Sequence, residues 1–568
     1  MRDFLKQYIP YYKNYKMKFF YSILGMIMIA LGTAGTAYVI KPVLDEIFIN
    51  KDVTMLYLLP FAVVFLYTMK GVGRYIQTYY ISYIGSDIIR IVRDKFLKHI
   101  LHQDMKFFNT KHGGELISRV GNDIAAIQSA VSTNVAVLVT ESLTIIALIG
   151  VVIYQSPVLA FFGLIVLPVI IYPLSKLAQK MKRLAKEGQA KTAILMSILS
   201  EIFNNIEIII ASNSQNTKHD QFSKQNLEIF HIGMRGVKTN ALVSPLMEFV
   251  GSVAAAIVIA MGGMEVINGN LSVGSFFSFM TALFMLYTPI KRLSSVYNSF
   301  QTALAANERI NEIFASKSEI IEGSSNLKNI KKLEFKNVSL KYGAKIALQN
   351  INIIAQKGEK IALVGDSGGG KSSLVNLLLR FYDTYKGDIL FDDDSIKDIT
   401  FKSLRENISI VTQRVYIFND TIAANISFGY EYDENKVIQV LKQAHALDFV
   451  NNLEDGINTY LDEFGSNLSG GQRQRIAIAR ALYNDPQILI FDEATSALDN
   501  ESEAIITNVL EEVSKDKITF VIAHRLSTIR NATKILVFKD GEIICEGDEE
   551  ELLKNCSEYK RLHTLAGT

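Results

Sequence analysis

The chain has 568 residues, of which 49% are hydrophobic and 20% are charged, and its formal net charge is only +2. This length is too great for a single domain. The small net charge gives no indication of a general affinity for nucleic acid. The two cysteines, Cys545 and Cys556, stand near the C-terminus in a part that we expect in the cytosol, so we expect neither a disulfide framework nor a metal cluster.

The first half of the chain contains repeated apolar runs. A helix needs about 20 mostly apolar residues to cross the hydrocarbon core of a membrane. We expect six such spans, at residues 19–40, 55–83, 131–154, 158–174, 243–267 and 273–287. The first apolar stretch is longer than the core of a signal peptide and lacks a small-residue cleavage site, so we interpret it as a retained span.

The connectors between these spans alternate between very short and very long. The long ones, roughly 85–130 and 175–242, are rich in Lys and Arg and are helical in composition. By the positive-inside rule, both long connectors and the N-terminus lie in the cytosol. A helical leg of about 20 residues would extend some 30 Å beyond the bilayer and could contact a cytosolic domain. An inert anchor needs no such stalks, whereas this half alone does not exclude a channel.

From about residue 333 the pattern changes to short β-branched runs that alternate with turns and helices, which is typical of an α/β domain. We therefore predict a multidomain protein, in which an all-α six-helix transmembrane domain precedes an α/β domain. The predicted boundaries are 1–315 for the transmembrane domain, 316–332 for a linker and 333–568 for the α/β domain.

A glycine-rich loop in the second half carries the strongest chemical signal. An apolar strand, 361–364, leads into the loop, and a helical pattern follows it, which is the context that a P-loop requires. Backbone N–H groups of the loop cradle phosphates, the lysine adds a positive charge, and the first hydroxyl reaches Mg²⁺. The predicted phosphate-binding residues are Gly365, Asp366, Ser367, Gly368, Gly369, Gly370, Lys371, Ser372 and Ser373.

A second strand, 488–491, ends in the carboxylates Asp492 and Glu493. Carboxylates that follow a buried parallel strand lie beside phosphates bound at the same edge of the sheet. We assign Asp492, together with Ser372, to Mg²⁺ and Glu493 to the base that polarises the attacking water. By itself, an apolar strand followed by two acidic residues is more often a solvated strand end. In a chain that also has a P-loop, it is the expected second part of a nucleotide site.

Between these two elements lies the sequence Asn-Leu-Ser-Gly-Gly-Gln, 467–472, followed by a basic helical run. Together with ILIFDEATSALD, it resembles the signature of the ATP-binding cassette (ABC) family. The resemblance implies that Ser469, Gly470, Gly471 and Gln472 contact ATP held on the P-loop of another copy, and hence a homodimer with two composite sites. A serine hydroxyl and glycine amides at a helix N-terminus are suited to that anion.

Other elements of the ABC pattern follow in the family's order. The resemblance implies that Tyr342 stacks on adenine, and that Gln413 reaches both the metal and the attacking water. It also implies that Asp499 crosses the dimer interface and that His524 senses the γ-phosphate. Each of these residue types is ordinary by itself; six elements in the same order are not. ATP and Mg²⁺ are the implied cofactors.

The domain order and the two long stalks resemble the exporters of this family that are classed as type IV. The resemblance implies coupling segments near 118–123 and 212–217, and a location in the bacterial inner membrane with the ATP-binding domain in the cytosol. Segments such as AYVIKPVLDEIF and MLYTPIKRLSSV are similar to those of the family's lipid A flippases. That similarity implies a lipid A-like anionic glycolipid as the membrane substrate.

Charged residues within predicted spans support a charged substrate, because such residues are costly in a membrane and are usually functional. We predict a substrate cavity that includes Lys70, Arg74 and Lys291, and Glu141 interrupts the third span. Lys70 and Lys291 match basic positions of the flippases, where a third basic position is Thr140 here. Lys291 and the adjacent Arg292 are equally well read as side chains that extend to the cytosolic interface.

Three other functions compete with the flippase. A multidrug exporter would use the same ATPase and move amphipathic drugs through an aromatic, Met-rich cavity. An ATP-gated channel is expected to have lost hydrolysis residues, yet Glu493 is present. A peptide-processing transporter needs an N-terminal protease domain, for which there is no room before the first span.

Overall fold

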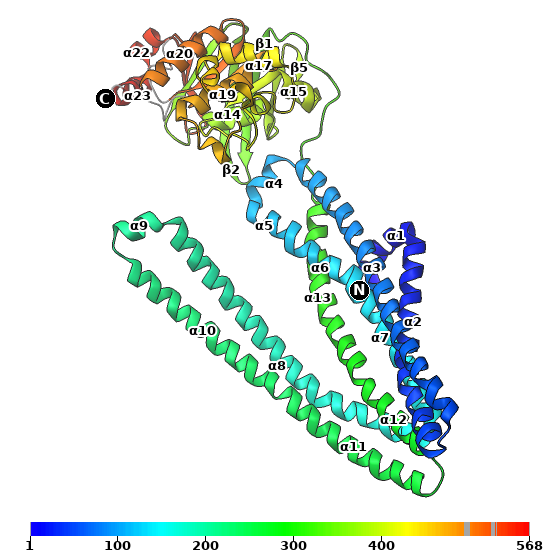
Figure 1. Ribbon diagram of the computed structural model, residues 1–568. Helices are drawn as coiled ribbons and strands as arrows, with labels where there is room; N and C mark the ends of the chain where they lie inside the picture. The colour runs from blue at the N-terminus through cyan, green and yellow to red at the C-terminus, as the bar shows by residue number, and fades with distance from the viewer. Residues whose placement is uncertain (1, 494–499, 524–528, 530, 567–568) are drawn as a thin grey trace. The chain divides into compact units, whose positions relative to one another are not determined.

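The computed structural model describes residues 2–566 apart from 494–499, 524–528 and 530 (Figure 1). The chain divides into two compact units. Met1–His99 and Gly114–Ala315 form a helical unit, and Ile100–Gly113 and Ser316–Thr568 form an α/β unit. Helices therefore precede an α/β domain along the chain, and the predicted fold class is confirmed.

Four helical stretches among the described residues are long and apolar enough to cross a membrane: Lys6–Ile49, Val53–Leu101, Gly113–Gln155 and Val273–Ala315. These stretches contain four of the six predicted spans. The other two predicted spans, 158–174 and 243–267, lie in α8 (Pro157–Asn204) and α11 (Val243–Ile267). That the chain crosses the membrane six times stays a prediction.

The long connectors continue the spans as helices. The helix α3 (Val53–Leu101) has 49 residues and α8 has 48. At 1.5 Å per residue each is about 70 Å long, more than twice the roughly 30 Å of a hydrocarbon core. The helices α8 and α10 (Gln215–Ala241) pack side by side and are joined through α9 (Ile206–Ala211), which forms the tip of this arm (Figure 1).

Polar groups and apolar side chains together hold the centre of the helical unit. There α2 (Lys16–Pro42), α7 (Val135–Gln155) and α12 (Val273–Met285) meet around the fully buried Leu148 and Phe279. Within this core Ser278 Oγ donates to the carbonyl of Ala37 at 2.9 Å, and Gln155 Nε2 donates to Ser278 Oγ at 3.0 Å. Such interhelical hydrogen bonds satisfy polar groups that a lipid environment cannot.

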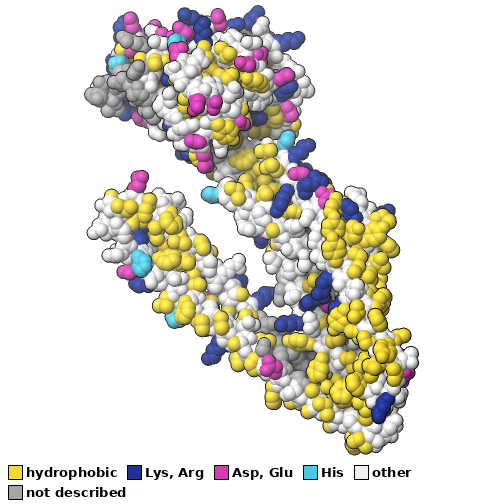
Figure 2. Space-filling model, in the orientation of Figure 1, with side chains coloured by type: hydrophobic (Ala, Val, Ile, Leu, Met, Phe, Trp, Pro, Cys, Tyr) yellow, Lys and Arg dark blue, Asp and Glu magenta, His cyan; other side chains and the backbone are white. Residues whose placement is uncertain are grey.

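The remaining helical segments of this unit are short, apart from α13 (Tyr287–Ala315), which ends it. They are α1 (Arg2–Tyr12), η1 (Lys13–Tyr15), η2 (Val43–Ile49), α5 (Gly113–Ser118), η3 (Arg119–Asp123), α6 (Ile124–Ser129) and η4 (Ala130–Asn134). Hydrophobic side chains cover most of the lower part of the unit in Figure 2, whereas Lys and Arg gather where the α8–α11 arm joins the other helices.

Two sheets organise the α/β unit. The four-stranded sheet has the order β2-β1-β4-β5, and its neighbouring strands are antiparallel. The six-stranded sheet has the order β10-β9-β3-β8-β7-β6, in which only the edge pair β9–β10 is antiparallel. Its parallel strands are buried and apolar, as for a sheet covered on both faces.

The strands are β1 (Lys332–Tyr342), β2 (Lys345–Gln356), β3 (Lys360–Gly365), β4 (Lys386–Phe391), β5 (Asp394–Ser395), β6 (Ile408–Val411), β7 (Ile488–Asp492), β8 (Ile518–Ile522), β9 (Lys534–Lys539) and β10 (Glu542–Gly547). The helices are α4 (Met105–Thr110), α14 (Lys371–Leu378), α15 (Phe401–Asn407), α16 (Ile422–Ile426), α17 (Glu434–Gln443), α18 (Leu447–Asn451), α19 (Gly470–Leu482), α20 (Asn500–Ser514), α22 (Glu549–Asn555) and α23 (Ser557–Ala566). Because β3, β6, β7 and β8 run in one direction, their carboxyl ends share one edge of the sheet.

The segment Ile100–Gly113 belongs to the α/β unit although its flanking helices do not. In it, Asn109 Nδ2 donates to the Tyr382 hydroxyl at 2.6 Å, and Lys106 Nζ pairs with Glu319 at 2.5 Å. The coupling segment predicted at 118–123 lies within the helical unit, where the buried Asp123 pairs with Arg309. That 118–123 and 212–217 act as coupling segments stays a prediction.

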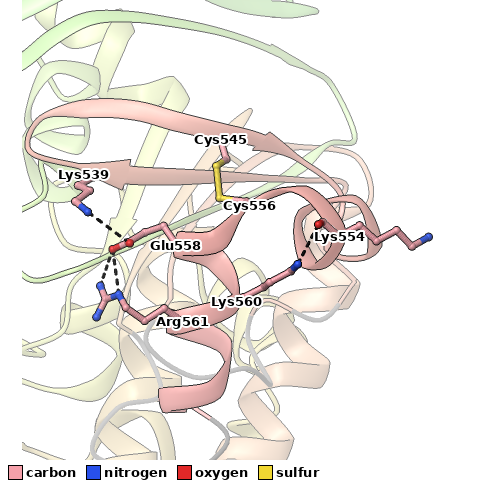
Figure 3. Close-up of a disulfide and its surroundings, with 7 residues drawn as sticks. All are labelled: Lys539, Cys545, Lys554, Cys556, Glu558, Lys560 and Arg561. Atoms are coloured by element: carbon pink, nitrogen blue, oxygen red, sulfur yellow. Dashed lines mark hydrogen bonds and ion pairs between the residues drawn. A yellow bond between two sulfur atoms is a disulfide. The ribbon is translucent and has the colours of Figure 1, made fainter.

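Contrary to the expectation from the sequence, Cys545 and Cys556 form a disulfide (Figure 3). The expectation rested on compartment alone. The fold brings the two residues together, because α22 runs back beside β10 and places the two Cα atoms 6.3 Å apart. The bridge fastens the start of α23 to the edge strand of the large sheet.

Candidate nucleotide site and membrane cavity

The P-loop runs from β3 into α14 with a backbone that requires glycine. Gly365 has φ +145°, and a Cβ there would lie 2.2 Å from the carbonyl oxygen of Phe538. Gly370 caps α14 with φ +113°, and a Cβ there would lie 2.8 Å from Leu348. The backbone and its close neighbours thus require glycine at these two positions, and the loop leads into the N-terminus of α14, where the helix dipole favours an anion.

Lys371 begins α14 and is buried. Its Nζ donates to the carbonyl oxygens of Gly365 at 2.7 Å and of Asp366 at 3.0 Å, so the ammonium is held over the loop. Burial lowers the pKa of Lys371, while the nearby carboxylates of Glu493, Asp366 and Asp492 oppose that shift. A partly desolvated cation is stabilised by a bound anion such as a phosphate.

Gln413 and Glu493 meet although 80 residues separate them. Gln413 follows β6 and Glu493 follows β7, and the parallel register of these strands places both at the same edge. Gln413 Nε2 donates to Glu493 Oε2 at 2.5 Å. Glu493 itself has a left-handed backbone, with φ +49°, a conformation that is uncommon outside glycine and is often found at functional sites. The predicted base and its predicted amide partner are thus in direct contact.

Tyr342 ends β1 beside the P-loop helix. Its hydroxyl accepts a hydrogen bond from Asn376 Nδ2 at 3.0 Å, which ties the ring to α14. The ring centroid lies 4.8 Å from that of Tyr382 in an edge-to-face arrangement. Asn376 and Tyr382 were not among the predicted residues; the helical spacing after Lys371 puts Asn376 one turn along α14, which is the only signal that could have singled it out.

The signature segment forms a helix cap. Ser469 Oγ accepts from the N–H of Gln472 at 3.2 Å, and the Gln472 side chain accepts from the N–H of Ser469 at 2.8 Å, a reciprocal capping box. A Cβ on Gly471 would lie 2.4 Å from Ser502 Oγ, so α19 and α20 approach closely there. The cap leaves Ser469 exposed at a helix N-terminus, as the predicted phosphate contact requires.

Two predicted residues, Asp499 and His524, lie outside the described residues. Ser372 follows Lys371 in the first turn of α14, and Asp492 ends β7. Mg²⁺ prefers oxygen ligands and keeps several waters, so a serine hydroxyl, an amide oxygen and one carboxylate form a suitable donor set. Among the described residues no cluster of three or more His, Cys, Asp or Glu could hold a metal ion.

The helical unit contains a cavity of about 320 Å³. Three cations and one carboxylate line it, together with mostly small or aliphatic residues. Its lining comprises Ile29, Thr33, Lys70, Arg74, Gln77, Val137, Thr140, Glu141, Thr144, Met285, Thr288, Pro289 and Arg292. Glu141 is only 8% exposed and pairs with Arg292 Nη1 at 2.7 Å. The buried hydroxyl of Thr140 makes no hydrogen bond within the described part of the chain.

Lys70 and Arg74 therefore line this cavity together, whereas Lys291 does not. Lys291 is exposed, with Nζ 6.0 Å from the ring centroid of Tyr287, and its neighbour Arg292 takes the place in the cavity that Lys291 was expected to hold. Adjacent residues on a helix point about 100° apart, so only one of the pair can face inward.

Both units match models of known protein families. Residues 19–290 match the family model "ABC transporter transmembrane region", and residues 348–496 match "ABC transporter". The chain is 40% identical over 567 residues to an ATP-dependent lipid A-core flippase of Syntrophus aciditrophicus, covering 99% of this chain and 94% of the relative. It is 41% identical to the protein of that name from Desulfotalea psychrophila, over 97% of each.

A solved structure of a bacterial Atm1-family exporter with ATP bound superposes with a TM-score of 0.82 at 23% identity. That likeness covers 97% of this chain and 98% of the other, and at this identity it shows the fold alone. The resemblance first seen in the P-loop, the signature and the second carboxylate strand is thereby confirmed over both units.

Proposed function

This chain belongs to the ABC transporter family, and from that premise we propose that it moves a lipid A-like anionic glycolipid between the leaflets of the bacterial inner membrane. The chain is a membrane protein that binds and hydrolyses ATP to drive translocation. The finer parts of the proposal are the glycolipid, the homodimer, the Mg²⁺ ion, the inner membrane and the cytosolic position of the N-terminus and the α/β unit.

At the nucleotide site, each residue has a role that its contacts support. Lys371 would turn from the carbonyls of Gly365 and Asp366 toward the β- and γ-phosphates. Glu493, held by Gln413, would accept the proton of the attacking water. Ser372, Asp492 and Gln413 would hold Mg²⁺, which supplies charge neutralisation at the phosphates when it is bound.

The capped Ser469 supports a dimer. Its hydroxyl and the first amides of α19 form an anion site, and the family pattern puts the phosphate that they bind on the P-loop of a second copy. Two ATP molecules would then clamp two α/β units together, and hydrolysis would remove the γ-phosphate bridges. Strictly monomeric protein with full ATPase activity would contradict this arrangement.

The cavity carries the substrate proposal. Its three cations, Lys70, Arg74 and Arg292, face a single carboxylate, Glu141, so the wall has an excess of positive charge that suits phosphate groups. Isolated cations in a membrane interior are costly, and a bound anion offsets that cost. Relatives that carry the name lipid A-core flippase, at about 40% identity over nearly the whole length, support the same class of substrate.

The lining gives less support to a multidrug exporter. A cavity for hydrophobic cations is expected to be aromatic and Met-rich, yet this lining has one methionine, Met285, and no aromatic side chain among the described residues. A gated channel without hydrolysis is disfavoured by the contact between Gln413 and Glu493.

The proposal is tested by stimulation of ATP hydrolysis in the full-length protein in nanodiscs. A glycolipid with two phosphates should raise the ATPase rate in a saturable manner, and the same glycolipid without phosphates should do so less well. A panel of cationic amphipathic drugs should have little effect. Stimulation by the drugs alone would overturn the glycolipid assignment and favour the multidrug exporter.

A further inference from the structure

We propose that Arg561, in the C-terminal helix α23, is a positioning residue for the nucleotide site: it neutralises Asp366 of the P-loop, so that the loop accepts a triphosphate without repulsion from its own carboxylate. The inference rests on the nucleotide site assigned above. It adds a residue from outside every ATP-binding motif of the chain.

The contact is direct and joins residues that are 195 positions apart. Arg561 Nη2 lies 2.5 Å from Asp366 Oδ2 and 2.6 Å from Glu558 Oε1, so one guanidinium bridges two carboxylates. Asp366 immediately follows Gly365 in the loop, and its side chain is 60% exposed. An exposed pair of this kind contributes little to folding, so its effect is expected on the charge of the site.

Asp366 brings an unfavourable charge to a phosphate-binding loop. Its backbone carbonyl accepts a hydrogen bond from Lys371 Nζ, the ammonium that is to meet the phosphates. A carboxylate on this loop repels a polyanionic ligand, and a guanidinium paired with it reduces that repulsion.

The helix that carries Arg561 is anchored rather than free. Tyr559, on the same helix, is 1% exposed in the core of the α/β unit, and Cys556 just before the helix is bridged to Cys545 in β10 (Figure 3). Glu558 also pairs with Lys539 at the end of β9, at 3.5 Å. Its hydrogen bond with Arg561 is the main cause of a lowered pKa, so Glu558 stays ionised and orients the guanidinium.

The hairpin formed by β9 and β10 also supports the P-loop. The N–H of Gly541, in the β9–β10 turn, donates to the carbonyl of Gly369 at 3.0 Å, and Phe538 packs against Gly365. The loop is therefore held from the C-terminal segment at two places, by the hairpin at its backbone and by Arg561 at its one charged side chain before Lys371. Replacing Arg561 therefore changes the charge beside the loop and leaves the backbone support from the hairpin in place.

The test compares the KM for ATP of four variants of the full-length protein in nanodiscs. Arg561→Ala should raise KM about two- to fivefold, the range expected for losing an exposed ion pair, with a smaller change in kcat. The double variant Arg561→Ala/Asp366→Asn should have a KM within about twofold of that of Asp366→Asn alone, because the carboxylate that Arg561 neutralises is absent from both. Arg561→Lys should keep KM low, because it keeps the charge.

Lys560→Ala is the matched control, because Lys560 lies on the same helix but donates to the carbonyl of Lys554 at 3.0 Å. If Arg561→Ala folds poorly, judged by its thermal midpoint, Arg561→Gln replaces it in the comparison. An unchanged KM in the neutral Arg561 variant, or a raised KM that persists in the double variant, would overturn the inference. Absence of ATP hydrolysis in the unaltered protein would instead overturn the proposed function.

Discussion

The two units build their sites in different ways. In the α/β unit, Gln413 and Glu493 come together because parallel strands end at a common edge, so chain segments far apart in sequence have a fixed register. In the helical unit, Lys70, Arg74 and Arg292 meet in a cavity whose lining depends on how each long helix is rotated. The first arrangement can be inferred from motifs, and the second only from the packed helices.

The difference also concerns the groups that neutralise charge. Around the P-loop each cation has a close partner: Arg561 pairs with the carboxylate of Asp366, and Lys371 donates to the carbonyl oxygens of Gly365 and Asp366. In the cavity one carboxylate faces three cations. The charged groups around the P-loop thus have partners within the α/β unit, whereas the cavity lining has an excess of positive charge.

The largest expected effect concerns Glu493, the proposed base of the nucleotide site. Glu493→Gln should lower the ATPase rate by at least about 100-fold, because an amide cannot accept a proton from water. ATP binding should remain, as measured with labelled nucleotide. Glu454→Gln, which alters an exposed carboxylate in the same unit, is the control. Undiminished hydrolysis in Glu493→Gln would show that Glu493 is not the general base.

The next prediction concerns the disulfide, which forms because α22 places Cys556 beside β10 in the α/β unit. Cys545→Ser should lower the local stability around β10 and α23 by about 2–3 kcal/mol, as expected for a short closed loop. Hydrogen exchange of these segments measures the effect in the whole protein. Treatment of the unaltered protein with a thiol reductant should reproduce it, and the variant should not respond to the reductant. Equal exchange in all three samples would contradict the bridge.

The cavity provides the next test, since it distinguishes two lysines with similar sequence signals. Lys70→Ala should raise the concentration of two-phosphate glycolipid needed for half-maximal ATPase stimulation about tenfold, the cost of one charged hydrogen bond. Lys291→Ala should raise it much less, because Lys291 does not line the cavity. The opposite ranking would show that the substrate lies outside this cavity.

The smallest expected effect concerns the support of Tyr342. Tyr342→Phe and Asn376→Ala each remove the hydrogen bond of 3.0 Å between the ring and α14, and each should raise the KM for ATP about two- to threefold. The double variant should be no worse than either single one, because both remove the same bond. Additive effects would mean that Asn376 acts independently of the ring.

Much of the nucleotide site could be predicted because its motifs are local. Gly365 to Ser373 turn from strand to helix within nine residues of continuous sequence, and Asp492 and Glu493 follow a strand that is buried by composition alone. Family order added Tyr342, Gln413 and Ser469. Arg561 and Asn376 could not be found in this way, since a lone arginine or asparagine on a helix has no pattern until the helix is docked.

The helical unit shows what the sequence leaves open. Charge in an apolar run marked Lys70 and Arg74, but the choice between Lys291 and Arg292 depends on the rotation of α13, about 100° between neighbours. The disulfide was missed because compartment, and not the distance between Cys545 and Cys556, was the basis for that expectation.

The most direct test of ATP-driven lipid movement is a leaflet assay in proteoliposomes. A fluorescent glycolipid with two phosphates is placed in the leaflet that faces the α/β unit, and its loss from that leaflet is followed after addition of Mg²⁺ and ATP. The account predicts transfer that requires ATP hydrolysis and is absent in Glu493→Gln. Equal transfer with and without ATP, or transfer of cationic drugs but not of the glycolipid, would contradict it.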